Sequence, residues 1–286
     1  MARVTATGFA PRRCVVSFSG AGFETVIDPR RCGPTREELM QSAPPPNPLE
    51  DAGVLIAGGT TGIGREIALG LARRGARVFV FGREGEPLAE VAEQAQAFGA
   101  TIRGVTADMS MRADVDRAFA AFDAQVGRLD AFVGCAALGA GPLARMEEDA
   151  WRYVVETNLI GTMACTRRAI DRLKPHGGRI VLIGSVAADL RAEGESVYAA
   201  TKAGVQAFVE ALRREERAHD VRISLVEPGA TATDMQPMNQ DAKARSTARA
   251  QMLHAADIAR GVLYMLSEPL HCDVSLMRIV PARQAL

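Results

Sequence analysis

The chain has 286 residues, enough for one large domain or two small ones, each with a substantial hydrophobic core. Lys and Arg total 34 and Asp and Glu total 34, so the formal net charge is zero and the chain lacks the basic field that non-specific nucleic-acid binding requires. Hydrophobic residues make up 48% and charged residues 24% of the sequence, which is typical of a folded globular protein and excludes a disordered chain.

The sequence gives no sign of a membrane span, a secretion signal or a metal site. No run approaches the roughly 18 apolar residues of a spanning helix, and Arg12, Arg13 and Ser17 interrupt the place of a signal-peptide core. We therefore expect a cytoplasmic protein that does not bind membranes. The five cysteines predict reduced thiols, with a bridge between Cys14 and Cys32 as the alternative. The four histidines have no metal-ligand spacing, so no metal is expected.

The proline-rich stretch 44–48 separates two unlike segments of the chain. In the N-terminal extension, residues 1–46, strand candidates 14–19 and 23–27 flank a Gly-Ala-Gly turn and predict a hairpin, and a capping box at Thr35 predicts a short helix. Such a piece is too small to be stable alone, so we expect it to dock on the rest of the chain or on a neighbouring subunit. The alternatives are a flexible tail or a misassigned translation start.

After the prolines, short apolar strand candidates alternate with longer segments of helical periodicity. These strand candidates are residues 54–57, 77–81, 101–105, 131–133, 179–183, 222–226 and 276–280. This βαβ order predicts an α/β domain over residues 50–286, in which parallel strands form an open sheet with helices on both faces. Ligands of such sheets bind beyond the carboxyl ends of the strands.

A glycine-rich loop, residues 58–64, joins the first of these strands to a helix. Its sequence, Gly-Gly-Thr-Thr-Gly-Ile-Gly, lets the backbone turn tightly and approach a pyrophosphate held by the helix N-terminus. The alternative is a tight strand-to-helix connection without a ligand.

Tyr198 and Lys202 are four residues apart in a helical pattern, so both side chains lie on one face. The ammonium group can lower the pKa of the phenol towards neutrality and so make it an acid or base, although this spacing also occurs on surface helices. Ser185 follows the strand candidate 179–183 and can donate to a substrate oxygen or cap a turn. Asn158 lies in mid-helix, where it kinks the helix, holds a water or is simply solvated.

Taken together and in order, these residues resemble the classical short-chain dehydrogenase/reductases over roughly residues 50–286. The matching positions are the glycine loop 58–64, Asp108, Asn158, Ser185, Tyr198, Lys202, Pro228, Gly229 and Thr233. The resemblance implies a Rossmann-type, doubly wound sheet of seven parallel strands and a catalytic tetrad of Asn158, Ser185, Tyr198 and Lys202. It also assigns contacts with a nicotinamide cofactor to Gly58, Thr60, Thr61, Gly62, Ile63, Gly64, Arg83, Asp108, Met109, Cys135, Ala136, Tyr198, Lys202, Pro228, Gly229, Thr231 and Thr233.

The resemblance gives each member of the tetrad a role in hydride transfer between nicotinamide and a carbonyl or secondary alcohol. Tyr198 donates a proton to the developing alkoxide, and Ser185 binds the same oxygen. Lys202 lowers the pKa of Tyr198 and holds the nicotinamide ribose, while Asn158 positions a water. The C-terminal sequence is similar to the branch of 3-hydroxy acid (serine-type) and clavulanate dehydrogenases, which implies a homo-oligomer, a tetramer or a dimer.

Two features concern the cofactor. Arg83 follows Gly82 at the end of the second strand of the sheet, where members that prefer NAD carry an acid, so NADP(H) is the expected cofactor and NAD(H) the alternative. A simply exposed arginine is the other interpretation of Arg83. Residues 134–137 read Gly-Cys-Ala-Ala in place of the family's Asn-Asn-Ala-Gly, which removes amide groups from the cofactor site.

The segment 231–253 corresponds to the family's substrate lid. Met235, Met238 and Met252 in it either line an apolar pocket or fill the core. A non-catalytic, cofactor-binding protein with a regulatory or interaction role is the alternative to an enzyme, and the intact tetrad argues against it. A dehydratase or epimerase of the extended branch is disfavoured because that branch has a larger C-terminal region.

Overall fold

A computed structural model describes residues 14–17, 24–27, 48–236, 238–269 and 272–284. The chain divides into two compact units, Met1–Pro46 and Asn47–Leu286. In the first unit, β1 (Cys14–Ser17) pairs antiparallel with β2 (Glu24–Ile27), with Cys14 opposite Ile27. The helix expected at Thr35, the docking of the extension and the alternative bridge to Cys32 all lie outside the described residues.

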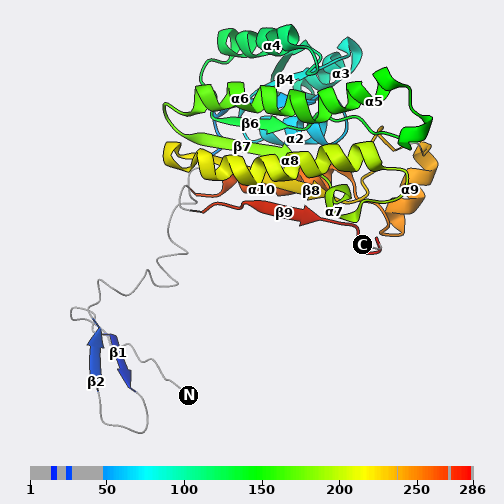
Figure 1. The fold of residues 1–286 in the computed structure, drawn as a ribbon. Helices are drawn as coiled ribbons and strands as arrows, with labels where there is room; N and C mark the ends of the chain where they lie inside the picture. Colours follow the sequence, from blue (N-terminus) through cyan, green and yellow to red (C-terminus); the bar gives the residue numbers. More distant parts are fainter. Residues whose placement is uncertain (1–13, 18–23, 28–47, 237, 270–271, 285–286) are drawn as a thin grey trace. The chain divides into compact units, whose positions relative to one another are not determined.

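The second unit contains a sheet of seven parallel strands in the order β5-β4-β3-β6-β7-β8-β9 (Figure 1). The strands are β3 (Gly53–Ala57), β4 (Arg77–Gly82), β5 (Ile102–Thr106), β6 (Ala131–Gly134), β7 (Gly178–Ile183), β8 (Val221–Pro228) and β9 (Leu276–Ile279). Each lies within two residues of its expected position, and the predicted doubly wound α/β fold is confirmed. The chain changes direction across the sheet between β3 and β6, which is where such folds place their ligands.

Helices cover both faces of the sheet (Figure 1). They are α2 (Gly62–Ala72), α3 (Gly85–Gln96), α4 (Arg112–Gln125), α5 (Glu148–Val155), α6 (Thr162–Leu173), α7 (Ala187–Leu190), α8 (Ser196–Glu215), α9 (Gln240–Ala248) and α10 (Ala255–Ser267). Two short 3-10 segments, η2 (Leu143–Arg145) and η4 (Arg217–His219), and a π-helical segment, η3 (Glu156–Gly161), complete the unit.

The core consists of one apolar layer on each face of the sheet. In β3, Val54 and Ile56 pack into the layer that contains residues of α2 and α10, whereas Leu55 and Ala57 pack into the layer formed with α4, α6 and α8. Successive side chains of a strand point to opposite faces, so an uninterrupted apolar strand requires cover on both sides. The central strands are therefore fixed rigidly, and their carboxyl ends form a stable edge for a site.

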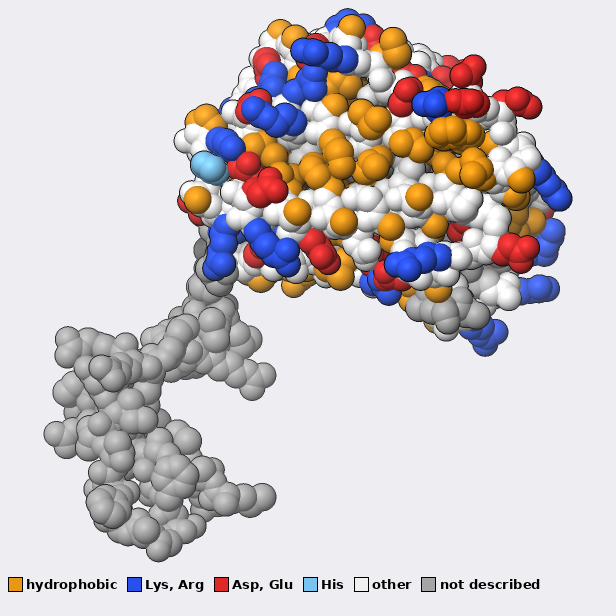
Figure 2. Space-filling view, viewed as in Figure 1, with side chains coloured by type: hydrophobic (Ala, Val, Ile, Leu, Met, Phe, Trp, Pro, Cys, Tyr) orange, Lys and Arg blue, Asp and Glu red, His pale blue; other side chains and the backbone are white. Residues whose placement is uncertain are grey.

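Two surface features complete the description. Hydrophobic side chains gather over α6 and α8 (Figure 2). Ile160 in η3 and Met163 in α6 are 55% and 37% exposed. In the parts of the chain that the structure describes, no helix is both long enough and apolar enough to cross a bilayer.

Candidate active site

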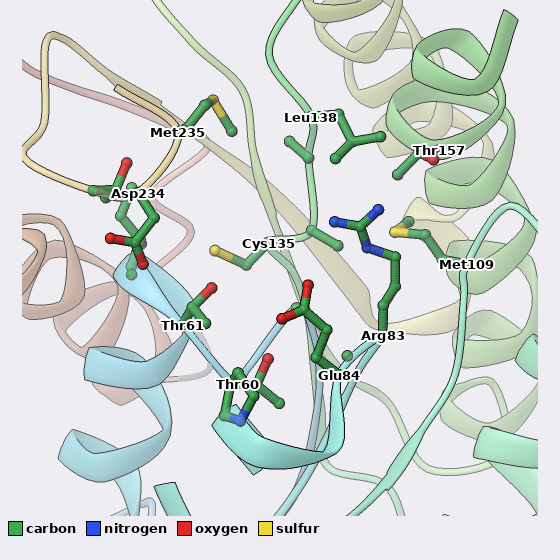
Figure 3. Close-up of a pocket in the computed structure, with 18 of the residues that line it drawn as sticks. Thr60, Thr61, Arg83, Glu84, Met109, Cys135, Leu138, Thr157, Asp234 and Met235 are labelled. Carbon is green, nitrogen blue, oxygen red and sulfur yellow. The ribbon is translucent and has the colours of Figure 1, made fainter. Parts of the chain in front are cut away.

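A cavity of about 1000 Å³ lies beyond the carboxyl ends of β3, β4, β5 and β6. Figure 3 shows Arg83 and Glu84 reaching into it from the loop after β4, with Met109 and Cys135 nearby. Eleven of the residues expected to bind the cofactor line this cavity: Gly58, Thr60, Thr61, Gly62, Ile63, Arg83, Asp108, Met109, Cys135, Ala136 and Thr233. The topology thus gathers residues that are up to 175 positions apart in the sequence, from 58 to 233.

The glycine loop packs so closely against neighbouring backbone that Gly58 and Gly64 have no space for a side chain. Gly58 has a φ of 74°, and a Cβ added there would lie 2.5 Å from the Ala136 backbone nitrogen. A Cβ added at Gly64 would lie 1.9 Å from the Gly58 carbonyl oxygen. Because α2 begins at Gly62, its unpaired N–H groups and positive dipole end lie at the loop, beside the cavity. This cradle fits the pyrophosphate of a dinucleotide.

Two residues that line the cavity, Arg83 and Asp108, form a hydrogen-bonded group with the Tyr153 side chain. The Arg83 guanidinium donates from Nη1 to the Tyr153 hydroxyl at 3.1 Å, and that hydroxyl donates to Asp108 Oδ2 at 2.5 Å. Asp108 Oδ1 accepts hydrogen bonds from Ser110 N and Oγ at 2.9 and 2.8 Å. Burial opposes ionisation of the carboxyl, but these bonds outweigh it and lower the pKa of Asp108.

Asn158 lies in the π-helical segment η3 and is buried, with 1% of its surface exposed. Its Oδ1 accepts from Leu138 N at 2.7 Å, and its Nδ2 donates to Leu138 O at 2.8 Å and to Thr201 Oγ1 at 3.3 Å. The interpretation of Asn158 as a solvated residue is therefore wrong. Its side chain links Leu138, in the loop after β6, to η3 and α8 through these hydrogen bonds. This loop forms one wall of the cavity.

Ser185, Tyr198 and Lys202 lie together beyond the carboxyl end of β7. Ser185 Oγ accepts from Ala187 N at 3.1 Å and is hydrogen-bonded to Tyr198. Lys202 is 3% exposed, and its Nζ donates to Ile183 O at 2.9 Å and lies 5.7 Å from the centre of the Tyr198 ring. The structure therefore brings these three residues into one group.

The expected lowering of the pKa of Tyr198 by Lys202 is absent from this structure. Burial raises the pKa of Tyr198, and the hydrogen bond with Ser185 only partly opposes this effect. Burial also lowers the pKa of Lys202, to about 8. The physical reason is burial, which disfavours the charged phenolate and is the largest influence on Tyr198, while the Lys202 ammonium donates its hydrogen bond to Ile183 O.

The tetrad does not line the cavity itself, and neither do Gly64, Pro228, Gly229 and Thr231. A Cβ added at Gly229 would lie 2.3 Å from Gln284 Oε1, so this glycine, like Gly64, is closely packed against its neighbours. Thr231 is buried, donates to Gly229 O at 2.9 Å and pairs with Leu253. Cys135 lies close to both regions, because it lines the cavity and is also near Lys202 and Tyr198. Burial raises the pKa of this thiol to about 12, so it is uncharged at neutral pH.

The predicted lid, residues 231–253, contains α9 and lies partly over the cavity. A Cβ added at Gly62 would lie 3.2 Å from the Thr233 methyl carbon, and one added at Gly139 would lie 3.4 Å from Met235 Cγ. Met235 lines the cavity, whereas Met252 is buried in the core. Met238 is 37% exposed and does not line the cavity, so it fits neither interpretation.

Sequence reasoning missed several residues of the site. Tyr153 and Thr157 come from α5 and η3, and Glu84 and Leu138 come from the loops after β4 and β6. Thr157 is 3% exposed, and its Oγ1 is one of the two buried side-chain polar atoms without a hydrogen-bond partner among the described residues. Tyr153 and Thr157 are four residues apart, which is compatible with one helix face, but this spacing alone does not indicate a site.

Comparison with known proteins agrees with this geometry. The family model described as short chain dehydrogenase matches residues 52–244. Carbonyl reductase family member 4 of Danio rerio is 31% identical over 75% of this chain and 91% of its own length. Serine 3-dehydrogenase of Agrobacterium fabrum is 30% identical over 81% of this chain and 94% of its own length, which is consistent with the expected branch. A short chain dehydrogenase structure from Burkholderia cenocepacia has a TM-score of 0.74 at 27% identity and covers 82% of this chain and 98% of its own.

The fold, the cavity and these matches define an oxidoreductase that acts with a nicotinamide cofactor on a CH–OH or C=O group of a small molecule. The chain belongs to the short-chain dehydrogenase family. The family, the fold and the class of enzyme expected from the sequence are thereby confirmed.

Proposed function

We propose that this protein is an NADP(H)-dependent ketoreductase or alcohol dehydrogenase, with Asn158, Ser185, Tyr198 and Lys202 as its catalytic group. One observation carries the proposal: two groups of residues lie at the carboxyl ends of the parallel strands. The first is the glycine loop together with Arg83, which line the cavity, and the second is Ser185, Tyr198 and Lys202. The structural neighbour from Burkholderia cenocepacia is a complex with NADP, which supports the choice of cofactor.

The cofactor preference is proposed from the residues at the end of β4. Gly82 is buried and has Thr60 Oγ1 2.5 Å from the place of a Cβ, so a larger side chain here would require Thr60 to move, and Gly82 offers no acid to bind a ribose 2′-hydroxyl. Arg83 follows it, is exposed and extends into the cavity (Figure 3). A guanidinium at this place is suited to a 2′-phosphate.

The proposed chemistry uses each member of the group in turn. A nicotinamide cofactor, when bound, supplies the hydride. Tyr198, whose raised pKa keeps it protonated at neutral pH, donates its proton to the oxygen of the carbonyl substrate, and Ser185 donates a hydrogen bond to the same oxygen. Lys202 stabilises the resulting tyrosinate as a cation, since its pKa of about 8 leaves it mostly charged at neutral pH. Asn158 holds the loop at Leu138 in place.

The proposal extends to assembly. Hydrophobic side chains gather on the surface over α6 and α8 (Figure 2), and Ile160 in η3 and Met163 in α6 are exposed. Such exposed apolar surface supports a homo-oligomer, a tetramer or a dimer. Light scattering of the purified chain measures its mass in solution.

The test of the proposed function is Tyr198→Phe. The variant loses the transferable proton and keeps the ring, so we expect NADPH binding to persist while reduction of carbonyl substrates falls by about 100-fold or more. Stopped-flow absorbance at the nicotinamide band and NADPH fluorescence titration measure the two quantities. Turnover close to wild type would contradict the tetrad. A wild-type protein that binds NADPH and reduces no carbonyl in a broad substrate panel would support the non-catalytic alternative instead.

A further inference from the structure

The group formed by Arg83, Tyr153 and Asp108 joins three separate elements of the fold. Arg83 follows β4, Asp108 follows β5, and Tyr153 lies on α5, which comes after the change of direction in the sheet. The Tyr153 hydroxyl is the centre of the group: it accepts from Arg83 Nη1 at 3.1 Å and donates to Asp108 Oδ2 at 2.5 Å. The Arg83 carbon Cζ also lies 5.9 Å from the centre of the Tyr153 ring.

The Tyr153 hydroxyl has a fixed orientation in this group. Asp108 is ionised, since its pKa is lowered, and it can only accept; burial and the bond to Asp108 raise the pKa of Tyr153, which therefore keeps its proton. The hydroxyl must then donate to the carboxylate and present its lone pairs to Arg83. Asp108 is in turn fixed by Ser110, so the chain of bonds ends on backbone.

Apart from Tyr153, little holds the Arg83 side chain in one position. It is exposed, and Tyr153 provides the one hydrogen bond that its guanidinium makes to the described part of the protein. Glu84, the next residue, also reaches into the cavity (Figure 3) and offers a competing carboxylate for the guanidinium. A long side chain that is not held in place pays rotamer entropy when it binds an anion.

We propose that Tyr153 is a positioning residue for Arg83 and thereby determines the preference of this enzyme for a 2′-phosphorylated cofactor. One N–H of the guanidinium is used to hold the group across the end of the cavity, and the other N–H groups remain for the phosphate. This inference rests on the proposed NADP(H) preference. It adds Tyr153 as the residue that holds the Arg83 guanidinium where it can bind the 2′-phosphate.

The experiment measures binding of two nucleotides that carry no nicotinamide, 2′,5′-ADP and 5′-AMP, by isothermal titration calorimetry on the full chain. For Tyr153→Phe we expect the dissociation constant of 2′,5′-ADP to rise about three- to tenfold, the cost of one unrestrained side chain, and that of 5′-AMP to change less than about twofold. Tyr264→Phe is the matched control, because this tyrosine is 49% exposed on α10 and does not line the cavity; it should change neither value.

A double-mutant cycle separates positioning from a general structural effect. Arg83→Ala should weaken 2′,5′-ADP about tenfold to 100-fold, and Tyr153→Phe added to Arg83→Ala should have no further effect, because Tyr153 acts through Arg83. An equal loss from Tyr153→Phe in both backgrounds, or no loss or tighter binding in the wild-type background, would overturn the inference about Tyr153.

The same measurements distinguish failure of the inference from failure of the proposed function. If wild type binds 2′,5′-ADP no better than 5′-AMP, the NADP(H) preference itself is wrong. If wild type prefers 2′,5′-ADP and Arg83→Ala removes this preference while Tyr153→Phe keeps it, only the role of Tyr153 is wrong.

Discussion

Lys202 carries a cost in stability that follows from its burial. The side chain is 3% exposed, and desolvation lowers its pKa from 10.5 to about 8. Between these two pKa values the unfolded chain binds more protons than the folded one, so stability rises with pH in this window. The penalty is present in full below about pH 8. A position evolved only for stability would hold an apolar residue here.

Lys202→Met removes the titrating group and keeps an unbranched side chain. We expect the free energy of unfolding of wild type, relative to this variant, to increase by about 2 to 3 kcal/mol between about pH 7 and about pH 10. The reason is that the buried Lys202 ammonium loses its proton over this range and its desolvation penalty disappears, whereas the variant has no such group. Urea unfolding at several pH values measures the difference, in which all other titrations cancel. A difference independent of pH would mean that Lys202 is charged in the folded protein throughout.

Two neighbouring buried polar residues in η3 have opposite hydrogen-bonding states. Asn158 makes three side-chain hydrogen bonds, two of them to the Leu138 backbone, whereas Thr157 Oγ1 makes none. We expect Asn158→Ala to lower the free energy of unfolding by about 2 to 3 kcal/mol, since the Leu138 backbone groups lose their partners. Thr157→Val, the matched control, should be neutral or stabilising by up to about 1 kcal/mol because it removes a desolvated hydroxyl.

Denaturant unfolding and amide hydrogen exchange at Leu138 check this pair. Faster exchange at Leu138 is expected in Asn158→Ala alone. Similar losses of stability in both variants would show that η3 responds to any change in its packing, and the assigned role of Asn158 would not stand.

At the residue scale, the sequence predicts which residues form the catalytic group, because their types and their order along the chain carry that information. Tyr198, Lys202 and Ser185 were predicted as a group, and the structure brings them together. Tyr153 could not be predicted, because a tyrosine at a helical position is equally compatible with the surface, and nothing in the sequence shows that this face of α5 turns towards Arg83. The four-residue spacing of Tyr198 and Lys202 predicts a lowered phenol pKa, and this prediction is wrong because a local spacing does not show that the fold buries Tyr198, which raises its pKa.

At the scale of elements, the glycine loop combines a positive φ with close packing, and the two effects can be separated. Gly58 and Gly99 have φ values of 74° and 80°, but only Gly58 has backbone within 4 Å of an added Cβ. Gly99→Ala should cost about 1 kcal/mol of stability, the strain of a left-handed alanine, and leave NADPH binding unchanged. Gly58→Ala should lower the stability by more than this and weaken NADPH binding at least about tenfold, because Ala136 and the glycine loop must move apart.

NADPH fluorescence titration and urea unfolding measure both variants. Equal effects of the two substitutions on NADPH binding would contradict the cradle. Equal effects on stability alone would mean that the loop after β6 moves away from the new side chain with little loss of folding free energy.

The positions of the strands followed from the sequence because each central strand is an apolar run bounded by polar or glycine residues. In β3 all five residues are buried, whereas the edge strand β9 has Leu276 half exposed. The π-helical segment η3 has no corresponding prediction, and it packs closely against a distant part of the chain: a Cβ added at Gly161 would lie 2.5 Å from the Met109 carbonyl oxygen. Such tertiary contacts have no local pattern in the sequence.

At the scale of the whole molecule, the unit Asn47–Leu286 contains both hydrophobic layers, and the first of their described residues along the chain is Leu49. We therefore expect a chain shortened to residues 47–286 to fold cooperatively and to bind NADPH with an unchanged dissociation constant. Calorimetry and fluorescence titration check this expectation, and an insoluble or molten product would show that residues 1–46 complete the core.

The extension itself, residues 1–46, is predicted from its sequence to dock. Phe18, Phe23, Val26 and Ile27 provide apolar surface that so short a piece cannot bury alone, and covering two or three of these side chains contributes several kcal/mol at roughly 25 cal/mol per Å², before ordering costs. A docked extension should raise the melting temperature of the full chain above that of residues 47–286 by about 4 °C or more. It should also slow proteolysis within residues 14–27, where β1 and β2 lie. Rapid cleavage throughout the extension, with equal melting temperatures and equal assembly of the two chains, would identify it as a passive tail.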